Sequence, residues 1–320
     1  MRIAIDLRMF NSSGIGTVIQ KLVPLIIDAH KDSHFYLLGR EHEIPVSLRE
    51  RPNTSFIRCS SPIYSISEQL ELPFKIPARI DLFWAPHYNI PLFYTGRLLV
   101  TVHDVLHLAM PEYVKGIHKR IYARSLFLAI KHRAAGIICD SAFTAQELQR
   151  LAGIPAERIT VIHNGIDAPS STAIPPPINK KPYFLFVGNV KPHKNLYRLV
   201  LAFESIATKV PHDLVIVGKK DGFITGDNEA QKAAVRLGDR VKFTGRIDDS
   251  ELAAYYAHAD ALAFPSLYEG FGFPPLEAMR YQIPVKMKPA PKACGPPDED
   301  CQLCPGADLY DEISPPSPED

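Results

Sequence analysis

Residues 268–277 read Tyr-Glu-Gly-Phe-Gly-Phe-Pro-Pro-Leu-Glu, the most informative stretch of the chain. Pro274 and Pro275 fit the first turn of a helix, because their missing N–H groups would find no partner there. The pattern therefore predicts Glu277 in the first helical turn and Glu269 on the loop before it. Such a helix start attracts phosphate, and carboxylates accept hydrogen bonds from sugar hydroxyls. The plain alternative is a pair of solvated surface carboxylates.

The composition is that of a globular protein long enough for two domains. The 320 residues are 46% hydrophobic and 22% charged, with a formal net charge of +1. This balance gives no general attraction to nucleic acid. No apolar run reaches the roughly 18 residues that a membrane helix needs, and the first residues lack the pattern of a signal peptide. We therefore expect a cytoplasmic protein in which Cys59 and Cys139 are reduced.

Short apolar runs alternate with amphipathic stretches, which predicts an α/β protein with parallel sheets. The expected strands are residues 2–6, 34–39, 54–58, 80–85, 98–103, 136–140, 159–162, 183–187, 213–217, 241–244 and 260–264. The expected helices are residues 15–29, 112–134, 144–152, 194–208, 229–237 and 249–259. Thr144 with Glu147 and Asp248 with Glu251 have the spacing of helix caps.

A Pro/Ser-rich segment, residues 168–182, interrupts this alternation and predicts a linker. It separates a first Rossmann-like domain, residues 1–167, from a second, residues 183–285. Just before the linker, His163-Asn164-Gly165 has the composition of a turn. Open parallel sheets bind ligands at the carboxyl ends of their strands, so the cleft between the two domains is the expected ligand site.

The first candidate binding element is Ser13-Gly14-Ile15-Gly16-Thr17, which follows the first strand. Glycines there let a ligand approach the backbone, and free N–H groups can meet an anion. A dinucleotide fingerprint also begins with Gly-x-Gly, but here Ile19 occupies its third glycine position. Arg40 also stands where a ribose-binding acid is expected, which argues against that fingerprint. A plain tight turn is the remaining alternative.

The second candidate is His103, which directly follows a very apolar strand. A lone histidine is more often structural than functional. Its position at the carboxyl end of a strand nevertheless favours a role in ligand binding. His87 ends the preceding strand in a similar way and is a weaker candidate.

The third candidate is the segment Val187-Gly188-Asn189-Val190-Lys191-Pro192-His193-Lys194-Asn195. A strand runs into a glycine turn, and a helix is expected to begin near Lys194. Cations at a helix N-terminus oppose the helix dipole and are costly unless an anion is bound. The segment thus indicates an anion site, with a solvated lysine pair as the alternative.

Residues 112–134 form the fourth candidate, a basic helix with an apolar stripe. Its cations are Lys115, Lys119, Arg120, Arg124, Lys131 and Arg133, and its stripe is Ile117, Ile121 and Leu128. Such a helix suits an anionic membrane surface or a lipid-linked phosphate acceptor. A solvated face over a buried stripe fits the pattern equally well.

Together these segments resemble the family 4 glycosyltransferases, which are retaining enzymes that use nucleotide-sugars. The resemblance rests on Glu269-x7-Glu277, on Thr101-Val102-His103-Asp104 and on the loop that ends at Lys194, and it covers roughly residues 1–285. It implies a GT-B fold, in which two Rossmann-like domains face each other across a cleft. It also implies catalysis without a metal or a resident cofactor.

The resemblance assigns roles to individual residues. Lys194 would hold the donor diphosphate, Glu269 and His103 the donor sugar, and Glu277 the ribose. Many relatives carry Arg where this chain has Asn189, so Lys191 or His193 would have to supply a second charge. The residues implied on the nucleotide side are Gly14, Gly16, Gly188, Asn189, Lys194, Gly270, Phe271, Gly272, Phe273 and Glu277.

The combination of Glu68-Gln-Leu-Glu-Leu-Pro73, His87 and Thr101-Val102-His103-Asp104 most resembles the bacterial mannosyltransferases that use GDP-mannose. The expected activity is transfer of a hexose to a glycan or lipid-linked acceptor in surface-polysaccharide or lipopolysaccharide assembly. No sequence feature identifies a general base. Two rival hypotheses are a nucleotide-sugar-binding pseudoenzyme and a sugar-nucleotide epimerase of the same fold.

Residues 286–320 differ from the rest of the chain, with eight prolines and three cysteines. Their composition predicts disorder. Three thiols without a nearby histidine argue against a structural zinc site. We therefore expect an incomplete second domain and hypothesise that this segment comes from a frameshift or a premature end, which would leave the chain weakly active or inactive.

Overall fold

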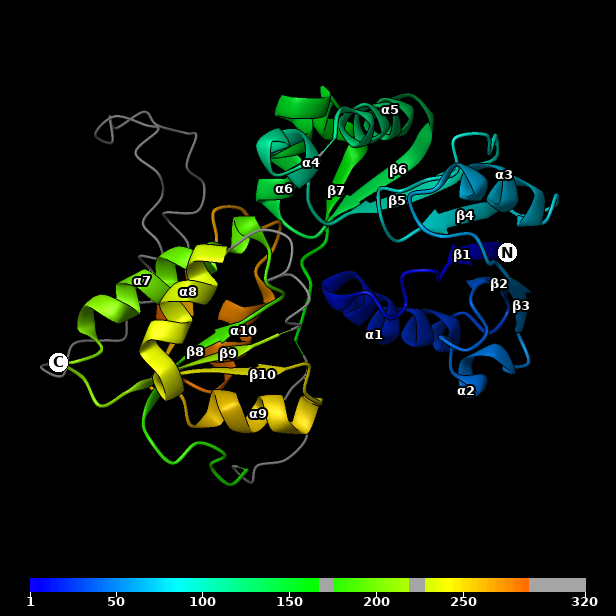
Figure 1. Ribbon diagram of the computed structural model, residues 1–320. Helices are drawn as coiled ribbons and strands as arrows, with labels where there is room; N and C mark the ends of the chain where they lie inside the picture. The colour runs from blue at the N-terminus through cyan, green and yellow to red at the C-terminus, as the bar shows by residue number, and fades with distance from the viewer. Residues whose placement is uncertain (115, 167–174, 219–227, 288–320) are drawn as a thin grey trace, which may run out of the picture. The chain divides into compact units, whose positions relative to one another are not determined.

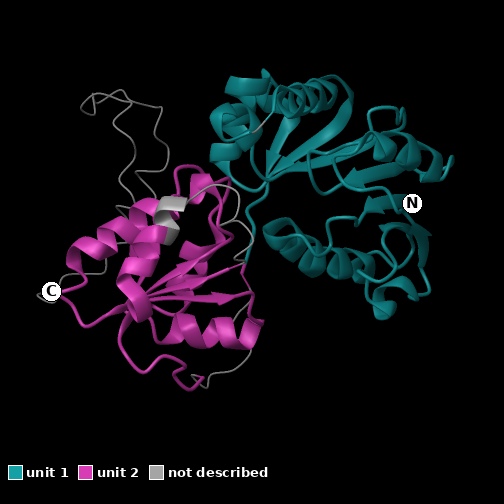
Figure 2. Ribbon diagram, viewed as in Figure 1, with its two compact units in different colours: residues 1–165 teal, residues 166–320 magenta. Residues whose placement is uncertain are grey.

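The computed structural model describes residues 1–114, 116–166, 175–218 and 228–287. The chain divides into two compact units, Met1–Gly165 and Ile166–Asp320 (Figure 2). Each unit has its own parallel sheet, labelled in Figure 1. The predicted α/β class with two Rossmann-like sheets is confirmed.

The first unit is built on a seven-stranded sheet with the order β3-β2-β1-β4-β5-β6-β7. All its neighbouring strands run parallel, so their carboxyl ends share one edge. The strands are β1 (Arg2–Asp6), β2 (His34–Gly39), β3 (Thr54–Arg58), β4 (Leu82–Ala85), β5 (Leu98–Val102), β6 (Ala134–Cys139) and β7 (Ile159–Val161).

The longer helices α1, α3 and α5 cover this sheet and bury apolar residues. Ile19 and Val23 of α1 pack against Ile5 and Leu37 of the strands, all fully buried. Burying such a side chain contributes about 1.5–3 kcal/mol. The helices are α1 (Ser13–Ala29), α2 (Val46–Arg49), α3 (Ile66–Lys75), α4 (Leu106–Ala109), α5 (Ile117–Arg133) and α6 (Ala142–Glu147), with helical turns η1 (Pro111–Tyr113), η2 (Leu148–Ala152) and η3 (Ala156–Arg158).

The second unit has a five-stranded parallel sheet with the order β10-β9-β8-β11-β12. Its strands are β8 (Tyr183–Val187), β9 (Asp213–Val217), β10 (Val241–Gly245), β11 (Ala261–Phe264) and β12 (Val285–Met287). Its helices are α7 (Leu196–Ile206), α8 (Asn228–Leu237), α9 (Asp249–Ala257) and α10 (Phe273–Arg280), with turns η4 (Pro192–Lys194) and η6 (Gly238–Arg240).

Alternate residues of the central strands enter two different cores, as expected for a sheet covered on both faces. Phe186 of β8 packs with Val200 and Phe203 of α7. Its neighbour Leu185 packs instead with Tyr256 of α9 and other residues of the opposite core. The long apolar runs of the sequence reflect this two-sided burial.

Several predicted details were wrong. The cap of α6 is Ser141, whose hydroxyl accepts from the Thr144 amide, so Thr144 and Glu147 lie inside the helix. The helix expected over 112–134 is interrupted after η1 and resumes at Ile117, behind Gly116 at φ 93°. The cap at Asp248, which accepts from the Glu251 amide, is confirmed.

Two further corrections concern the second unit. Helix α10 begins at Phe273, so Glu277 lies in its second turn and not in its first. Lys286 and Met287 belong to strand β12, which pairs with β11, although the sequence predicted an irregular tail from 286. The remaining calls on residues 167–174 and 288–320 lie outside the described residues.

Candidate functional site

Polar side chains gather at the carboxyl ends of the strands in the first unit. Because the strands are parallel, residues that follow them meet at one edge of the sheet. The buried or largely buried members are Asp6 at the end of β1, Arg8 after it, His87 and Asn89 after β4, His103 after β5, and Asp140 after β6. This edge is the candidate site of the first unit.

Arg8 is the centre of a buried ion network. Its guanidinium donates two bonds to Asp6, at 2.7 and 2.9 Å, and one to Glu68 of α3, at 2.6 Å. Burial alone would raise the pKa of Asp6, but the charges of Arg8 and His87 outweigh it and hold that pKa well below its usual range. All three side chains are fully buried, so each charge depends on its partners.

Neutral groups complete this network. Asn89 donates to both oxygens of Glu68, at 2.9 and 3.0 Å, and Tyr122 of α5 donates to one of them at 2.9 Å. Gln69 donates to the Tyr122 hydroxyl at 2.7 Å. The carboxylate of Glu68 is therefore saturated, and the network ties α3, α5 and two strand ends together. Glu68 lies in the segment Glu68–Pro73 that resembles the mannosyltransferases, but no sequence pattern indicated its place in this network.

Both ring nitrogens of His103 form hydrogen bonds to other groups of the protein. Nδ1 lies 3.0 Å from a carboxylate oxygen of Asp140, and Nε2 lies 2.9 Å from the carbonyl oxygen of Pro86. A carbonyl and a carboxylate only accept hydrogen bonds, so this geometry favours the imidazolium form, in which both nitrogens donate. Burial lowers the pKa of His103, but the hydrogen bond and charge of Asp140 outweigh it and raise the pKa overall.

The two predicted glycines of this unit play different parts. A side chain at Gly16 would meet the backbone oxygen of Phe10 at 2.5 Å, so α1 packs against the preceding loop only because this residue is glycine. A side chain at Gly14 would meet nothing within 4 Å. Both lie in the first turn of α1, and the tight packing at Gly16 is a structural requirement.

In the second unit, Lys194 and Glu269 are in direct contact. The Lys194 ammonium donates to a Glu269 carboxylate oxygen at 2.5 Å, and the two side chains are 17% and 22% exposed. The pair joins the turn after β8 to the loop before α10, 75 positions apart in the sequence. Of the predicted site residues, these two are brought together most clearly.

Backbone contacts hold this pair in place. Asn195, at φ 58°, donates to the Pro265 carbonyl at 3.1 Å, and the Leu267 amide donates to the His193 carbonyl at 2.7 Å. A side chain at Gly218 would clash with the Gly188 carbonyl at 2.0 Å, so the turns after β8 and β9 pack backbone to backbone. The Lys194 chain passes the open side of Gly188, 4.0 Å from where a Cβ would stand.

The residues around α10 complete the candidate site of the second unit. Gly272 caps the helix at φ 91°, a conformation that favours glycine, and the rings of Phe271 and Phe273 meet edge to face at 5.2 Å. Glu277 accepts from the Tyr256 hydroxyl at 2.6 Å. Burial raises the pKa of Glu277, and the Tyr256 bond only partly offsets that effect.

Asn189 lies partly buried behind Gly188. It brings no charge to this turn, so the cations of the segment are Lys191 and Lys194 beside His193. The turn places the Lys194 ammonium on the Glu269 carboxylate. The phosphate-binding role that the resemblance implies for Lys194 stays a prediction.

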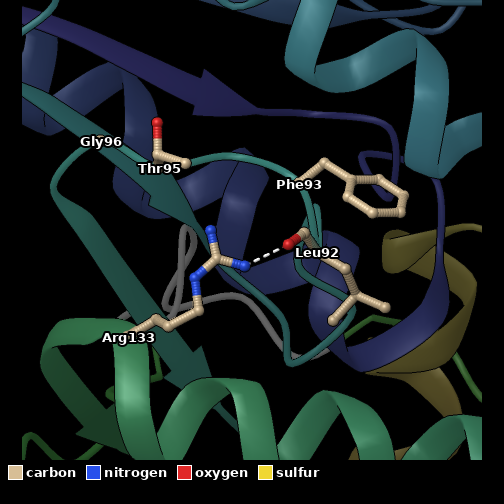
Figure 3. A pocket seen from close by; sticks show the side chains of 5 residues that line it. All are labelled: Leu92, Phe93, Thr95, Gly96 and Arg133. Atoms are coloured by element: carbon tan, nitrogen blue, oxygen red, sulfur yellow. Dashed lines mark hydrogen bonds between the residues drawn. The ribbon is translucent and has the colours of Figure 1, made fainter.

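A separate cavity of about 490 Å³ lies at the amino ends of β5 and β6 (Figure 3). Leu92, Phe93, Thr95, Gly96 and Arg133 line it. The Arg133 guanidinium points at the Leu92 carbonyl and donates to it. This cavity opens at the opposite edge of the sheet from His103 and Asp140, so it is not part of the candidate site.

Within the described residues, no group of three His, Cys, Asp or Glu side chains is arranged to hold a metal ion. No helix in the same residues is both long enough and apolar enough to cross a membrane.

Two family models match the chain. Residues 12–169 match "Glycosyltransferase Family 4", and residues 170–288 match "Glycosyl transferases group 1". The two matches follow each other and meet between the two units. The chain belongs to the family 4 glycosyltransferases, as the sequence motifs predicted.

Curated relatives agree with this family. Over 216 residues the chain is 30% identical to the O-antigen chain mannosyltransferase B of Escherichia coli, covering 62% of this chain and 55% of that protein. It is 28% identical over 205 residues to the O-antigen chain mannosyltransferase RfbU of Salmonella typhimurium, covering 64% and 55%. The chain thus spans about half the length of the curated relatives it matches.

Solved structures confirm the fold. The chain matches Anabaena HepE, crystallised with UDP and glucose, with a TM-score of 0.65 and 20% identity over 91% of this chain and 81% of that one. It matches WaaG, a glycosyltransferase involved in lipopolysaccharide biosynthesis, with a TM-score of 0.66 and 17% identity over 89% and 80%. These likenesses establish the two-domain GT-B class.

Proposed function

We propose that this protein is a retaining hexosyltransferase that moves a sugar from a nucleotide-sugar to a glycan or lipid-linked acceptor. The observation that carries the proposal is the Lys194–Glu269 pair at the carboxyl edge of the second sheet. It combines a cation suited to a diphosphate with a carboxylate suited to sugar hydroxyls.

Lys194 and Glu269 bind each other as long as no donor is bound, and a bound donor would replace this contact. When a donor diphosphate arrives, Lys194 exchanges the carboxylate of Glu269 for phosphate oxygens. Glu269 is then free to accept hydrogen bonds from the sugar. As the bond to the diphosphate breaks, negative charge grows on the leaving group, and a fixed ammonium stabilises it most at that stage.

At the start of α10 the backbone N–H groups belong to Phe271, Gly272 and Phe273, because Pro274 and Pro275 in the first turn have none. These donors suit phosphate oxygens because the helix dipole is positive at this end. Glu277 is assigned to the ribose hydroxyls. Its hydrogen bond to Tyr256 fixes one carboxylate oxygen and leaves the other to the ligand.

GDP-mannose is the proposed donor. The support is the mannosyltransferase function in the names of the relatives from E. coli and Salmonella. HepE was also crystallised with UDP-glucose, so a protein of similar fold holds another nucleotide-sugar. The proposed setting is the cytoplasmic face of the membrane, in bacterial polysaccharide or lipopolysaccharide assembly.

His103 is proposed to face the donor sugar as a cation. Because its two N–H groups are held by Asp140 and Pro86, it cannot act as a general base. It instead contributes a fixed positive charge and a flat ring surface. The leaving phosphate would then accept the proton of the acceptor hydroxyl, as in other retaining members of the family.

Helix α5 is the proposed membrane-facing element. Ile117, Ile121 and Leu128 are 69%, 57% and 58% exposed, and Lys119 and Arg124 are exposed beside them. Apolar side chains flanked by cations suit an anionic bilayer surface. Lys115, counted in the sequence prediction, lies outside the described residues.

A nucleotide-sugar-binding pseudoenzyme is the second candidate function. Asn189 favours it, because this position brings no charge to the diphosphate. The test is incubation with GDP-mannose and a lipid-linked glycan, in excess chelator. Transfer without added metal supports the enzyme, and donor binding without turnover supports the pseudoenzyme. A requirement for manganese or magnesium would contradict the proposed mechanism.

A further inference from the structure

A second cavity lies at the carboxyl edge of the first sheet, beyond the ion network. It measures about 510 Å³, within the range of about 300–1,000 Å³ typical of small-molecule sites. Its lining residues are Arg40, Glu41, His42, Arg49, Arg58, Cys59 and Ser60. Arg40 follows β2, Arg58 ends β3 and Arg49 ends α2, so three elements direct guanidinium groups to one cavity.

The cavity has an excess of positive charge. Arg40 is paired with Glu43 at 3.0 Å, and Arg49 with Glu41 at a longer 3.4 Å. Arg58 has no carboxylate partner among the described residues. Two carboxylates, Glu41 and Glu43, thus oppose three guanidinium groups, and the excess is the one positive charge of Arg58.

The cavity is also rigidly built. The Arg49 guanidinium lies 5.3 Å from the centre of the Phe56 ring and donates to the Ile44 carbonyl at 3.1 Å. The Cys59 amide donates to the Gly39 carbonyl at 2.8 Å, which fixes the ends of β2 and β3 beside each other. The Arg49 guanidinium is thus held in position before any ligand binds, whereas the Arg58 side chain is exposed.

We propose that this cavity binds the phosphoryl group of the acceptor, so that the acceptor is a phosphate- or diphosphate-bearing glycan or lipid. The proposal rests on the proposed transferase function, because it names the acceptor class of that reaction. Planar guanidinium groups match phosphate oxygens in pairs, and the cavity has room for more than one phosphate. The cavity also opens at the same sheet edge as His103 and Asp140.

The test is calorimetric titration with inorganic diphosphate of Lys194→Ala protein, in which the proposed donor site is disabled. Arg58→Gln, added to that background, should weaken binding about tenfold or more, since a charge-assisted bond is lost. Arg79→Gln is the matched control, because Arg79 is an exposed arginine at the amino end of β4. It should leave the affinity unchanged. Equal affinity in the Arg58 and Arg79 variants would overturn the proposal, whether or not the protein transfers sugar.

A kinetic arm uses the single variant Arg58→Gln. Its KM for a phosphate-bearing acceptor should rise about tenfold, while its KM for the donor stays constant. Tighter binding of a short isoprenyl diphosphate than of mannose 1-phosphate would assign a lipid-linked acceptor, and the reverse a soluble sugar phosphate. A KM that does not change for any phosphate-bearing acceptor would contradict the proposal.

Discussion

The two sheet edges of this protein use charge in different ways. At the edge of the first unit, Asp6, Arg8 and Glu68 are buried and each is bonded to several partners. At the edge of the second unit, Lys194 and Glu269 are partly exposed and each has the other as its ion-pair partner. A buried network in which each charge has several partners stabilises the fold. A single, partly exposed ion pair can instead separate so that each member binds a ligand. The comparison therefore separates groups that hold the fold from groups offered to the donor.

The largest expected effect is on stability, at Arg8. Arg8→Met leaves the carboxylates of Asp6 and Glu68 buried without their cation, which should cost about 3–5 kcal/mol in the free energy of unfolding. Denaturant unfolding followed by circular dichroism measures this loss. Arg236→Met, at an exposed pair with Glu204, is the control and should change the midpoint little. Similar losses in both variants would remove the distinction between buried and exposed charge.

Lys194→Ala should behave in the opposite way. Transfer should fall about 10² to 10³-fold, the usual result of removing one fixed electrostatic donor, while the melting temperature stays close to that of the parent. Lys209→Ala, an exposed lysine after α7, is the control. Near-normal turnover of the Lys194 variant would show that this residue does not hold the leaving diphosphate.

The two glutamates should separate nucleotide from sugar. Glu277→Gln should weaken free GDP and GDP-mannose alike, by about tenfold, because a charge-assisted bond to ribose becomes a neutral one. Glu269→Gln should weaken GDP-mannose and spare free GDP. Calorimetry with both ligands checks this, and equal losses for both ligands in both variants would contradict the assignment.

The smallest expected effect is a pH dependence at His103. Its pKa is raised in the folded protein, so the stabilisation by Asp140 is full below about pH 6.5 and is lost as the pH rises through the folded pKa. The charged groups that act on the ring are Asp140 and Asp104. In Asp140→Asn, the fall of the unfolding midpoint above pH 6.5 should flatten. An unchanged slope would mean that His103 is not held as a cation.

Much of the fold could be predicted because the strands are buried on both faces. Such strands appear as short apolar runs, and β1, β2, β3, β8 and β9 were predicted to the residue. Helix α3 was missed because Pro73 and its exposed apolar residues obscure the amphipathic pattern. Strand β12 was missed because its partner β11, which decides its pairing, lies more than twenty positions earlier.

The site was predictable only where a local pattern carries it. Lys194 and Glu269 stand in recognisable loops, but their contact depends on the turn around Asn195 and Pro265, which the sequence does not reveal. The sequence predicts Asp140 only as the last residue of a strand. Because His103 stands at the same position on the neighbouring strand, the strand order could have indicated their contact. Arg8 gave no local signal, because its partners Asp6 and Glu68 are assembled by the sheet and α3.

The most direct test of the central claim is calorimetric titration of GDP-mannose into the parent protein, Lys194→Ala and Asp140→Asn. The claim is that the Lys194–Glu269 pair opens to receive the diphosphate of a nucleotide-sugar. We expect saturable binding to the parent, at least tenfold weaker binding to Lys194→Ala, and much smaller weakening in Asp140→Asn. Equal affinity of the parent and Lys194→Ala, or no binding of any nucleotide-sugar to the parent, would contradict the claim.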